Sequence, residues 1–330
     1  MRELRDIFRL AIVSVGLLGL TPPLASASNK VTTKVTEPAP VDNSGNSAAA
    51  VVDPVYAAFD DGRYITALDL GKKAAAEGQA TAATLLGRLY ADGLGVARDP
   101  ATALAWFRKG AELGDANAKF EMGMMLAKGI GTAQDAAKAA DLFEAAAAAG
   151  NLEAKYNLGL LLAVGNGRPE DQVRAAALIE EAAKSGDPQA CYDLGQMYAN
   201  GAGVVWDDFQ AAHWIGIAAE AGLPDAQVDY ATLLFKGRGI KEDKVRAAWF
   251  FKAAAERGNP VAQDRLAHLY ASGVVYDKHP ETAAKWYLLA RRGKISDGWL
   301  DMLLADLTPT QRKEAETEAA AWMERADPAP

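Results

Sequence analysis

The sequence is poor in the residues that build disulfides and metal sites. Its 330 residues include one cysteine, Cys191, and only three histidines. A single cysteine excludes an intrachain disulfide, and no second thiol can resolve an oxidised one, so we interpret Cys191 as a small apolar core residue. His213, His268 and His279 never stand four residues apart, which is the spacing of a metal-binding helix. The sequence therefore predicts no metal site and no cofactor.

Motifs of the common enzyme classes are also missing. There is no G-x-S-x-G elbow, no phosphate-binding loop and no dinucleotide fingerprint, so we predict a protein that is not an enzyme. The alternative is a cell-envelope hydrolase acting on peptidoglycan or β-lactams, but the Ser-x-x-Lys motif that would favour it does not occur. A net charge of −8 without a visible basic patch argues against a nucleic-acid partner.

What the sequence does have is a unit of 36 residues, clearest at 187–222, that recurs six times over residues 79–293. One alanine and one glycine of the unit return in every copy. The alanine column is Ala82, Ala118, Ala154, Ala190, Ala226 and Ala262, and the glycine column is Gly93, Gly129, Gly165, Gly201, Gly237 and Gly273. A fixed period of this length predicts a helical solenoid, in which each unit buries its apolar face against its neighbours.

Each copy shows the spacing of two helices. In the fourth copy the apolar residues predict a first helix over about 189–200 and a second over about 208–221. Gly201 and Gly203 lie between them, where a left-handed helix exit and a tight turn need positive φ. Gly195 lets the two helix backbones approach closely, and we expect the ring at Trp214 to fill the space beside it.

An aspartate stands just before the second helix in five copies. We interpret it as a helix N-cap rather than as part of a catalytic carboxylate pair, because successive members lie one repeat apart. These residues are Asp99, Asp135, Asp171, Asp207 and Asp243.

Segments such as LLGRLYADGLGVARDPATALAWFRKGAELG resemble the Sel1-like repeat, a relative of the tetratricopeptide repeat. The resemblance covers about two thirds of the chain and implies an all-α fold, a right-handed α-solenoid of helix-turn-helix repeats. The third copy departs most: its turn reads GNGRPED and it has no aromatic at the Trp214 position, so we expect a looser turn there.

In the tetratricopeptide family, variable positions of the first helix line a concave groove that binds proteins. The equivalent positions here carry an apolar and aromatic strip with polar residues beside it, which suits a protein or peptide partner. The same side chains could instead pack on the adjacent repeat as core, and both alternatives stay open. The candidate groove residues are Arg88, Phe120, Met124, Tyr156, Leu160, Tyr192, Gln196, Thr232 and His268.

The two ends differ from the repeats. Residues 1–27 predict a cleaved secretory signal, with a basic start, an apolar run and Ala25-Ser26-Ala27 as the cleavage site. An uncleaved membrane anchor is the alternative, but about eleven apolar residues are too few to span a bilayer. Residues 28–52 predict a disordered linker, 53–78 a degenerate terminal repeat, and 294–330 C-terminal capping helices and a tail.

Together these features predict an exported, periplasmic or secreted, scaffold or adaptor that binds a protein or peptide. Resemblance to the family adds options for its role: regulation of a sensor kinase, exopolysaccharide secretion or envelope assembly. The sequence leaves the partner, the choice between regulator and assembly factor, and the oligomeric state open.

Overall fold

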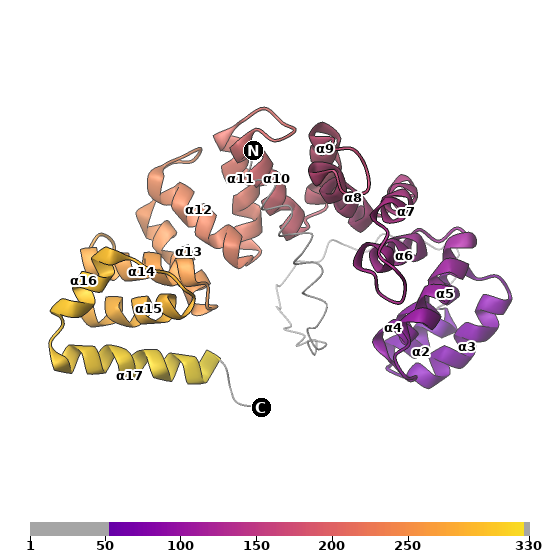
Figure 1. Cartoon of the computed structure of the whole chain (residues 1–330), viewed down its shortest axis with the longest axis horizontal. Coiled ribbons are helices and arrows are strands. Elements are labelled where there is room, and N and C mark those ends of the chain that lie inside the picture. The colour runs from indigo at the N-terminus through magenta and orange to yellow at the C-terminus, as the bar shows by residue number, and fades with distance from the viewer. Residues whose placement is uncertain (1–52, 327–330) are drawn as a thin grey trace, which may run out of the picture. The chain divides into compact units, whose positions relative to one another are not determined.

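A computed structural model of the chain describes residues 53–326. The predicted signal segment, 1–27, and the predicted linker, 28–52, lie outside the described residues. Within residues 53–326 there are sixteen helices and no strand, which confirms the predicted all-α class (Figure 1). Every helix in this range is too short or too polar to cross a membrane.

From α2 to α15 the helices alternate as first and second helices of successive units, and α16 and α17 follow the last repeat. They are α2 (Pro54–Asp60), α3 (Tyr64–Ala76), α4 (Ala80–Asp92), α5 (Pro100–Glu112), α6 (Ala116–Lys128), α7 (Ala136–Ala148), α8 (Leu152–Val164), α9 (Gln172–Lys184), α10 (Pro188–Asn200), α11 (Asp208–Glu220), α12 (Pro224–Lys236), α13 (Lys244–Glu256), α14 (Pro260–Ser272), α15 (Pro280–Arg292), α16 (Gly298–Asp306) and α17 (Pro309–Ala326). The two helices predicted in the fourth copy, α10 and α11, end within one residue of their expected bounds.

The recurring aspartate caps the second helix, as predicted. Asp207 accepts hydrogen bonds from the backbone N–H groups of Phe209 and Gln210, at 2.8 and 3.1 Å. These donors have no partner within the helix, so the carboxylate satisfies them and favours the helix dipole. The same cap precedes α5, α7, α9 and α13.

The two turn glycines have different tasks. Gly201 ends α10 in the left-handed conformation, with φ +65°, and its N–H bonds to the Met197 carbonyl. Gly203 also has positive φ, but in addition it lies against the start of the preceding second helix, where a Cβ would overlap the carbonyl oxygen of Gln172. The first glycine therefore caps a helix, and the second permits contact between successive repeats.

The space beside Gly195 is filled by a residue other than the expected one. A Cβ on Gly195 would stand 2.6 Å from Cγ1 of Ile215, not against Trp214, so the expectation for Trp214 was wrong by one position. The same holds at Gly87, which faces Phe107, and at Gly123, which faces Phe143. Phe107 and Phe143 are among the largest fully buried side chains. Side chains of successive helix residues point about 100° apart, so neighbouring positions can hold one buried and one half-exposed side chain.

The described chain divides into two compact units within the third copy. The N-terminal unit contains residues 53–154 and 166–168, and the C-terminal unit contains residues 155–165 and 169–326. In the third copy the Gly165 N–H bonds to Leu162, three residues back, at 3.4 Å, whereas Gly201 bonds four residues back. The turn predicted to be looser is thus built differently.

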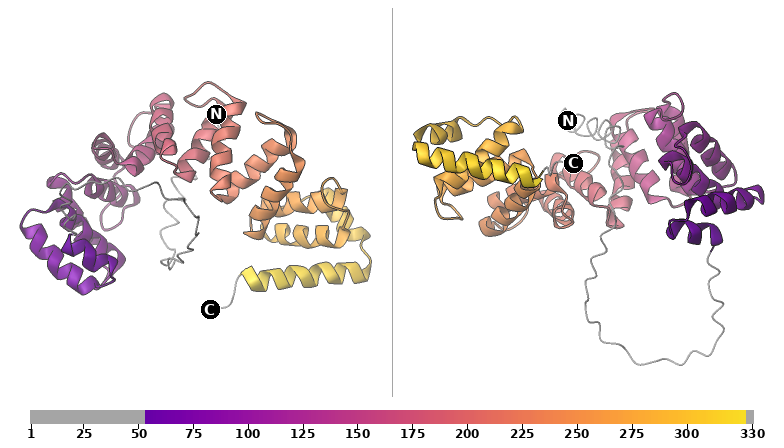
Figure 2. Two further views of the ribbon diagram at one scale, coloured as in Figure 1. Left: turned by 180° about the vertical axis from the view of Figure 1, so that it is seen from behind. Right: turned by 90° about the horizontal axis from the view of Figure 1, so that it is seen from below.

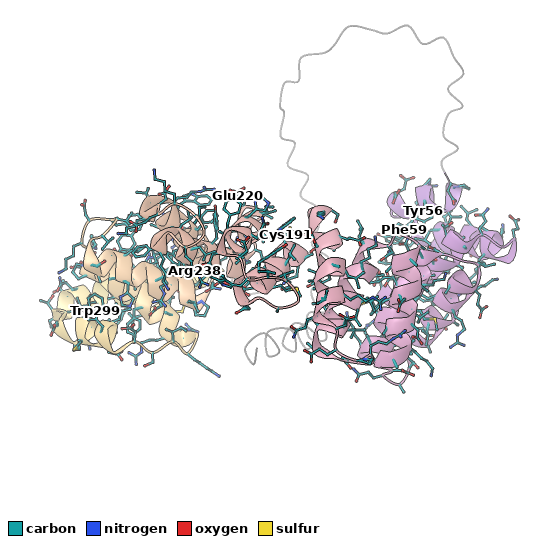
Figure 3. The ribbon with its side chains drawn as sticks, turned by 90° about the horizontal axis from the view of Figure 1, so that it is seen from above. Tyr56, Phe59, Cys191, Glu220, Arg238 and Trp299 are labelled. Carbon is teal, nitrogen blue, oxygen red and sulfur yellow. The ribbon has the colours of Figure 1, made fainter. Side chains whose placement is uncertain are left out.

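Helices α2 and α3 cover the first apolar face of the N-terminal unit. Val55 and Ala58 of α2 are buried in one cluster with Ala67 of α3 and Leu86 of α4. Phe59 packs edge-to-face against Tyr64, with ring centroids 5.6 Å apart. Figure 3 labels Phe59 and Tyr56, which both belong to α2. A helix pair that covers an apolar face in this way can serve as the terminal unit of a solenoid.

The C-terminal unit ends with α16 and α17. Thr308 and Gln311 form a reciprocal capping pair at the start of α17, with the Thr308 N–H donating to Gln311 Oε1 at 3.0 Å. Ala315 and Ala319 are buried as α17 packs along α15 (Figure 2). Helix α17 therefore lies against the second helix of the sixth repeat.

Candidate functional site

Three of the nine candidate groove residues lie in the N-terminal unit. Arg88 is half exposed and forms an ion pair of 3.2 Å with Glu121 of the next first helix. Phe120 is half-buried against Phe143, with ring centroids 5.8 Å apart. Met124 is also half-buried. In this unit the candidate residues are therefore partly exposed, and Arg88 and Phe120 also contact neighbouring side chains.

In the C-terminal unit, two tyrosines connect successive first helices. The Tyr156 hydroxyl donates to Asp193 at 2.6 Å, and the Tyr192 hydroxyl donates to Asp229 at 2.9 Å. Donor and acceptor are 37 residues apart in both pairs, one period plus one residue. Gln196 also donates to Asp229, at 2.5 Å. We call these four residues, Tyr156, Asp193, Tyr192 and Asp229, the tyrosine–aspartate ladder.

Burial sets the charge state of this ladder. Asp193 is 1% exposed, and the loss of hydration raises the pKa of its carboxyl to about 6, although hydrogen bonds from Tyr156 and Gln189 act in the opposite direction. Burial likewise raises the pKa of Asp229, and burial next to these carboxylates raises the pKa of both tyrosines. The tyrosines therefore remain neutral hydrogen-bond donors at any physiological pH.

The candidate residues thus differ in how they can meet a partner. Leu160 is 2% exposed and lies inside the helix packing. Tyr156, Tyr192 and Gln196 are half-buried and bonded to the next repeat, so they hold the repeats together and still show part of their surface. Their contact with a partner stays a prediction.

The two remaining candidates, Thr232 of α12 and His268 of α14, line one hollow of about 360 Å³. Sequence reasoning did not anticipate the rest of its wall, because the wall combines two helices one repeat apart with a third behind them. The hollow is completed by Phe235, Lys236, Phe251, Arg265 and Leu269.

The wall of the hollow is apolar at its base and basic at its rim. Phe251 and Leu269 are buried, whereas Lys236 and Arg265 are exposed. Such a site can hold an apolar side chain while its two cations attract a carboxylate.

The other candidates for chemistry lie apart from this hollow. Cys191 is fully buried, and burial raises the pKa of its thiol to about 11, so it is a core residue as predicted. His213 is exposed beside Trp214. His279 precedes α15 and pairs with Glu281 at 3.3 Å.

The helix pairs recur in six copies and the capping aspartate in five of them, and a family model matches these repeats. The model of the Sel1 repeat covers residues 80–115, 116–151, 152–187, 188–223, 224–259 and 260–293. The chain belongs to the Sel1 repeat family. Proteins of this family generally act as scaffolds for protein interactions and are typically not catalytic.

Solved Sel1 repeat structures resemble the chain over most of its length. A Sel1 repeat protein from Oxalobacter formigenes is 29% identical, with a TM-score of 0.64, over 74% of this chain and all of that one. The protective antigen c5321 of uropathogenic Escherichia coli, which has the same repeat fold, is 26% identical, with a TM-score of 0.57, over 84% of this chain and 68% of that one. None of the curated proteins matches the chain.

The fourth Sel1 repeat carries a second exposed surface that sequence reasoning missed. Val205, Trp206 and Phe209 are 87%, 57% and 68% exposed, around the start of α11. The sequence already distinguishes this surface, because the other copies have a polar or charged residue at the Trp206 position: Arg98, Gln134, Glu170, Glu242 or Lys278.

Proposed function

We propose that this Sel1 repeat protein is a non-enzymatic scaffold that holds a segment of a partner protein on the first helices of its C-terminal unit. The hollow between α12 and α14 carries the proposal, because it brings together the predicted residues Thr232 and His268. On the preceding first helix, Tyr192 and Gln196 are also partly exposed.

The charge of the hollow indicates the kind of segment that it takes. Lys236 and Arg265 form a basic rim on a chain whose net charge is −8. A complementary segment places an aromatic or aliphatic side chain against Phe251 and Leu269 and an Asp or Glu beside the two cations. Opposite charges at such a rim mainly guide the partner and fix its register, and the apolar contact supplies most of the affinity.

We further propose that the protein acts in the bacterial cell envelope. The basic, apolar and Ala-Ser-Ala features of residues 1–27 support export to the periplasm. Regulation of a sensor kinase, support of exopolysaccharide secretion and assembly of an envelope complex are the roles that fit an exported scaffold of this family.

Capture of partners from an envelope extract of the producing bacterium tests the role of the hollow. The double variant Lys236→Gln, Arg265→Gln removes both rim charges while keeping side chains of similar length. We expect it to retain the partner at least about tenfold less well than the wild type, because both attractive charges are lost.

A matched double variant controls for net charge. Lys241→Gln, Lys252→Gln removes two exposed cations of the same unit that do not line the hollow, and it should capture the partner like the wild type. Equal losses in the two double variants, or no loss in either, would contradict binding at the hollow. Circular dichroism melting shows whether all the proteins are folded.

A further inference from the structure

A cluster of two aspartates and a histidine lies where the sixth Sel1 repeat meets the C-terminal helices. Asp264 and His268 are four residues apart on α14, and Asp297 caps the start of α16. One ligand atom from each, an imidazole nitrogen or a carboxylate oxygen, lies within 4.8 Å of the other two. His268 Nε2 is 3.0 Å from Asp297 Oδ2.

One member of the cluster lacks a partner that its burial requires. Asp264 is 5% exposed, and its Oδ1 accepts no hydrogen bond. Its other oxygen lies 3.6 Å from the Arg265 guanidinium, which is too long for a hydrogen bond. A buried carboxylate oxygen without a partner costs free energy unless a proton or a cation satisfies it.

We propose that Asp264, His268 and Asp297 form a binding site for a divalent first-row transition metal, with zinc as the best match. Zinc takes histidine nitrogen and carboxylate oxygen together, whereas magnesium and calcium prefer oxygen ligands alone. Three protein ligands and a water complete a tetrahedral site.

The surroundings prepare these ligands for a metal. The other oxygen of Asp297 accepts from the backbone N–H groups of Trp299 and Leu300, at 2.9 and 3.0 Å, which fixes its carboxylate. The indole of Trp299, labelled in Figure 3, stacks on the His268 ring with centroids 5.0 Å apart and planes 13° apart. Hydrogen bonds and packing of this kind orient metal ligands.

Binding requires a small closure of the cluster. At zinc–ligand distances of about 2.0–2.2 Å, the ligand atoms of a tetrahedral site stand roughly 3.4 Å apart. His268 Nε2 and Asp297 Oδ2 are 3.0 Å apart, and the Asp264 ligand atom lies within 4.8 Å of both, so a small movement of Asp264 brings the three ligands to this spacing. The bound metal then joins α14 to α16 and fastens the C-terminal helices to the last repeat.

The test is zinc binding to the full chain produced without a histidine tag. We expect calorimetry to show one Zn²⁺ per chain, cobalt to give the visible absorption of a four-coordinate site, and zinc to raise the melting temperature. His268→Gln should weaken zinc binding at least about 100-fold, since loss of even an outer partner of a ligand costs 10–100-fold.

Two further variants make the result decisive. Asp297→Asn keeps the helix cap, because Asn caps as well as Asp, yet it removes a charged ligand and should weaken zinc at least about tenfold. His279→Gln alters a histidine outside the cluster and should bind zinc like the wild type. No stoichiometric binding, or equal binding by the wild type and both cluster variants, would overturn the proposal, and Asp297→Asn decides it alone if His268→Gln does not fold.

Discussion

A single buried carboxyl, that of Asp193, should make the stability of the C-terminal unit depend on pH. Its pKa is about 6 in the folded chain, against 3.8 as its ordinary value. Between these values the folded state holds a proton that the unfolded state has released, so stability falls as pH rises from about 4 to 6. Below about pH 4 the proton is bound in both states. Above about pH 6 it is released from both states, so Asp193 causes no further change in stability.

Asp193→Asn removes this titration. We expect its stability relative to the wild type to increase by up to about 3 kcal/mol between pH 4 and pH 7, since one pKa unit is about 1.4 kcal/mol. Urea unfolding at several pH values measures the difference. Asp69→Asn, at an exposed position on α3, serves as the control, and a parallel pH response in the two variants would show that Asp193 is not the source.

The two turn glycines of the fourth repeat offer a matched pair of substitutions. Gly201→Ala places a Cβ in ordinary contact with Trp206, so only its positive φ is unfavourable, at about 1–2 kcal/mol. Gly203→Ala has the same strain and also overlaps the Gln172 carbonyl, so we expect roughly 3 kcal/mol or more. Thermal unfolding that ranks Gly201→Ala as the more damaging would contradict the contact between repeats.

At the scale of the helices, the tyrosine–aspartate ladder links α8 to α10 and α10 to α12. Tyr156→Phe removes the hydroxyl that donates to Asp193 and leaves a buried carboxylate with one donor fewer. We expect a loss of about 1–3 kcal/mol in the free energy of unfolding at pH 7. A double-mutant cycle with Asp193→Ala, which removes the acceptor, measures the coupling, and strictly additive effects would show that the two side chains do not interact energetically.

The helices themselves were predictable from the sequence, because their signals are local. The capping aspartates, the left-handed glycines and the apolar spacing each act within a few residues, and they set the bounds of α10 and α11 to within one residue. The packing partner of Gly195 was not predictable with the same accuracy, because Trp214 and Ile215 are both apolar. Only the rotation of α11 decides which of them is buried.

At the scale of the whole chain, the candidate site was predictable in part. The repeat register placed Thr232 and His268 on equivalent first helices, and both line the hollow. The basic rim of the hollow depends on contacts between successive repeats, and the approach of Asp297 to His268 depends on contact between the last repeat and α16. The repeat pattern gives no side-chain positions for such contacts. Leu160 shows the limit of register alone, because an equivalent position is buried in one repeat and half exposed in another.

The proposed export of the chain has a direct measurement. If residues 1–27 are a cleaved signal, the mature protein begins at Ser28, and mass spectrometry of the protein from the envelope fraction should find that N-terminus. An intact Met1 in the membrane fraction would instead indicate an uncleaved anchor.

Photo-crosslinking from the hollow tests the central claim, protein binding on the first helices of the C-terminal unit, most directly. A photoreactive amino acid at Thr232 in the hollow and another at Phe209 on the exposed surface near α11 probe two sites of the same unit. Irradiated in the producing bacterium, the Thr232 probe should form a discrete crosslink to one protein, and Lys236→Gln with Arg265→Gln should reduce its yield at least about tenfold. A crosslink from Phe209 alone, or none from Thr232, would contradict the proposed binding site.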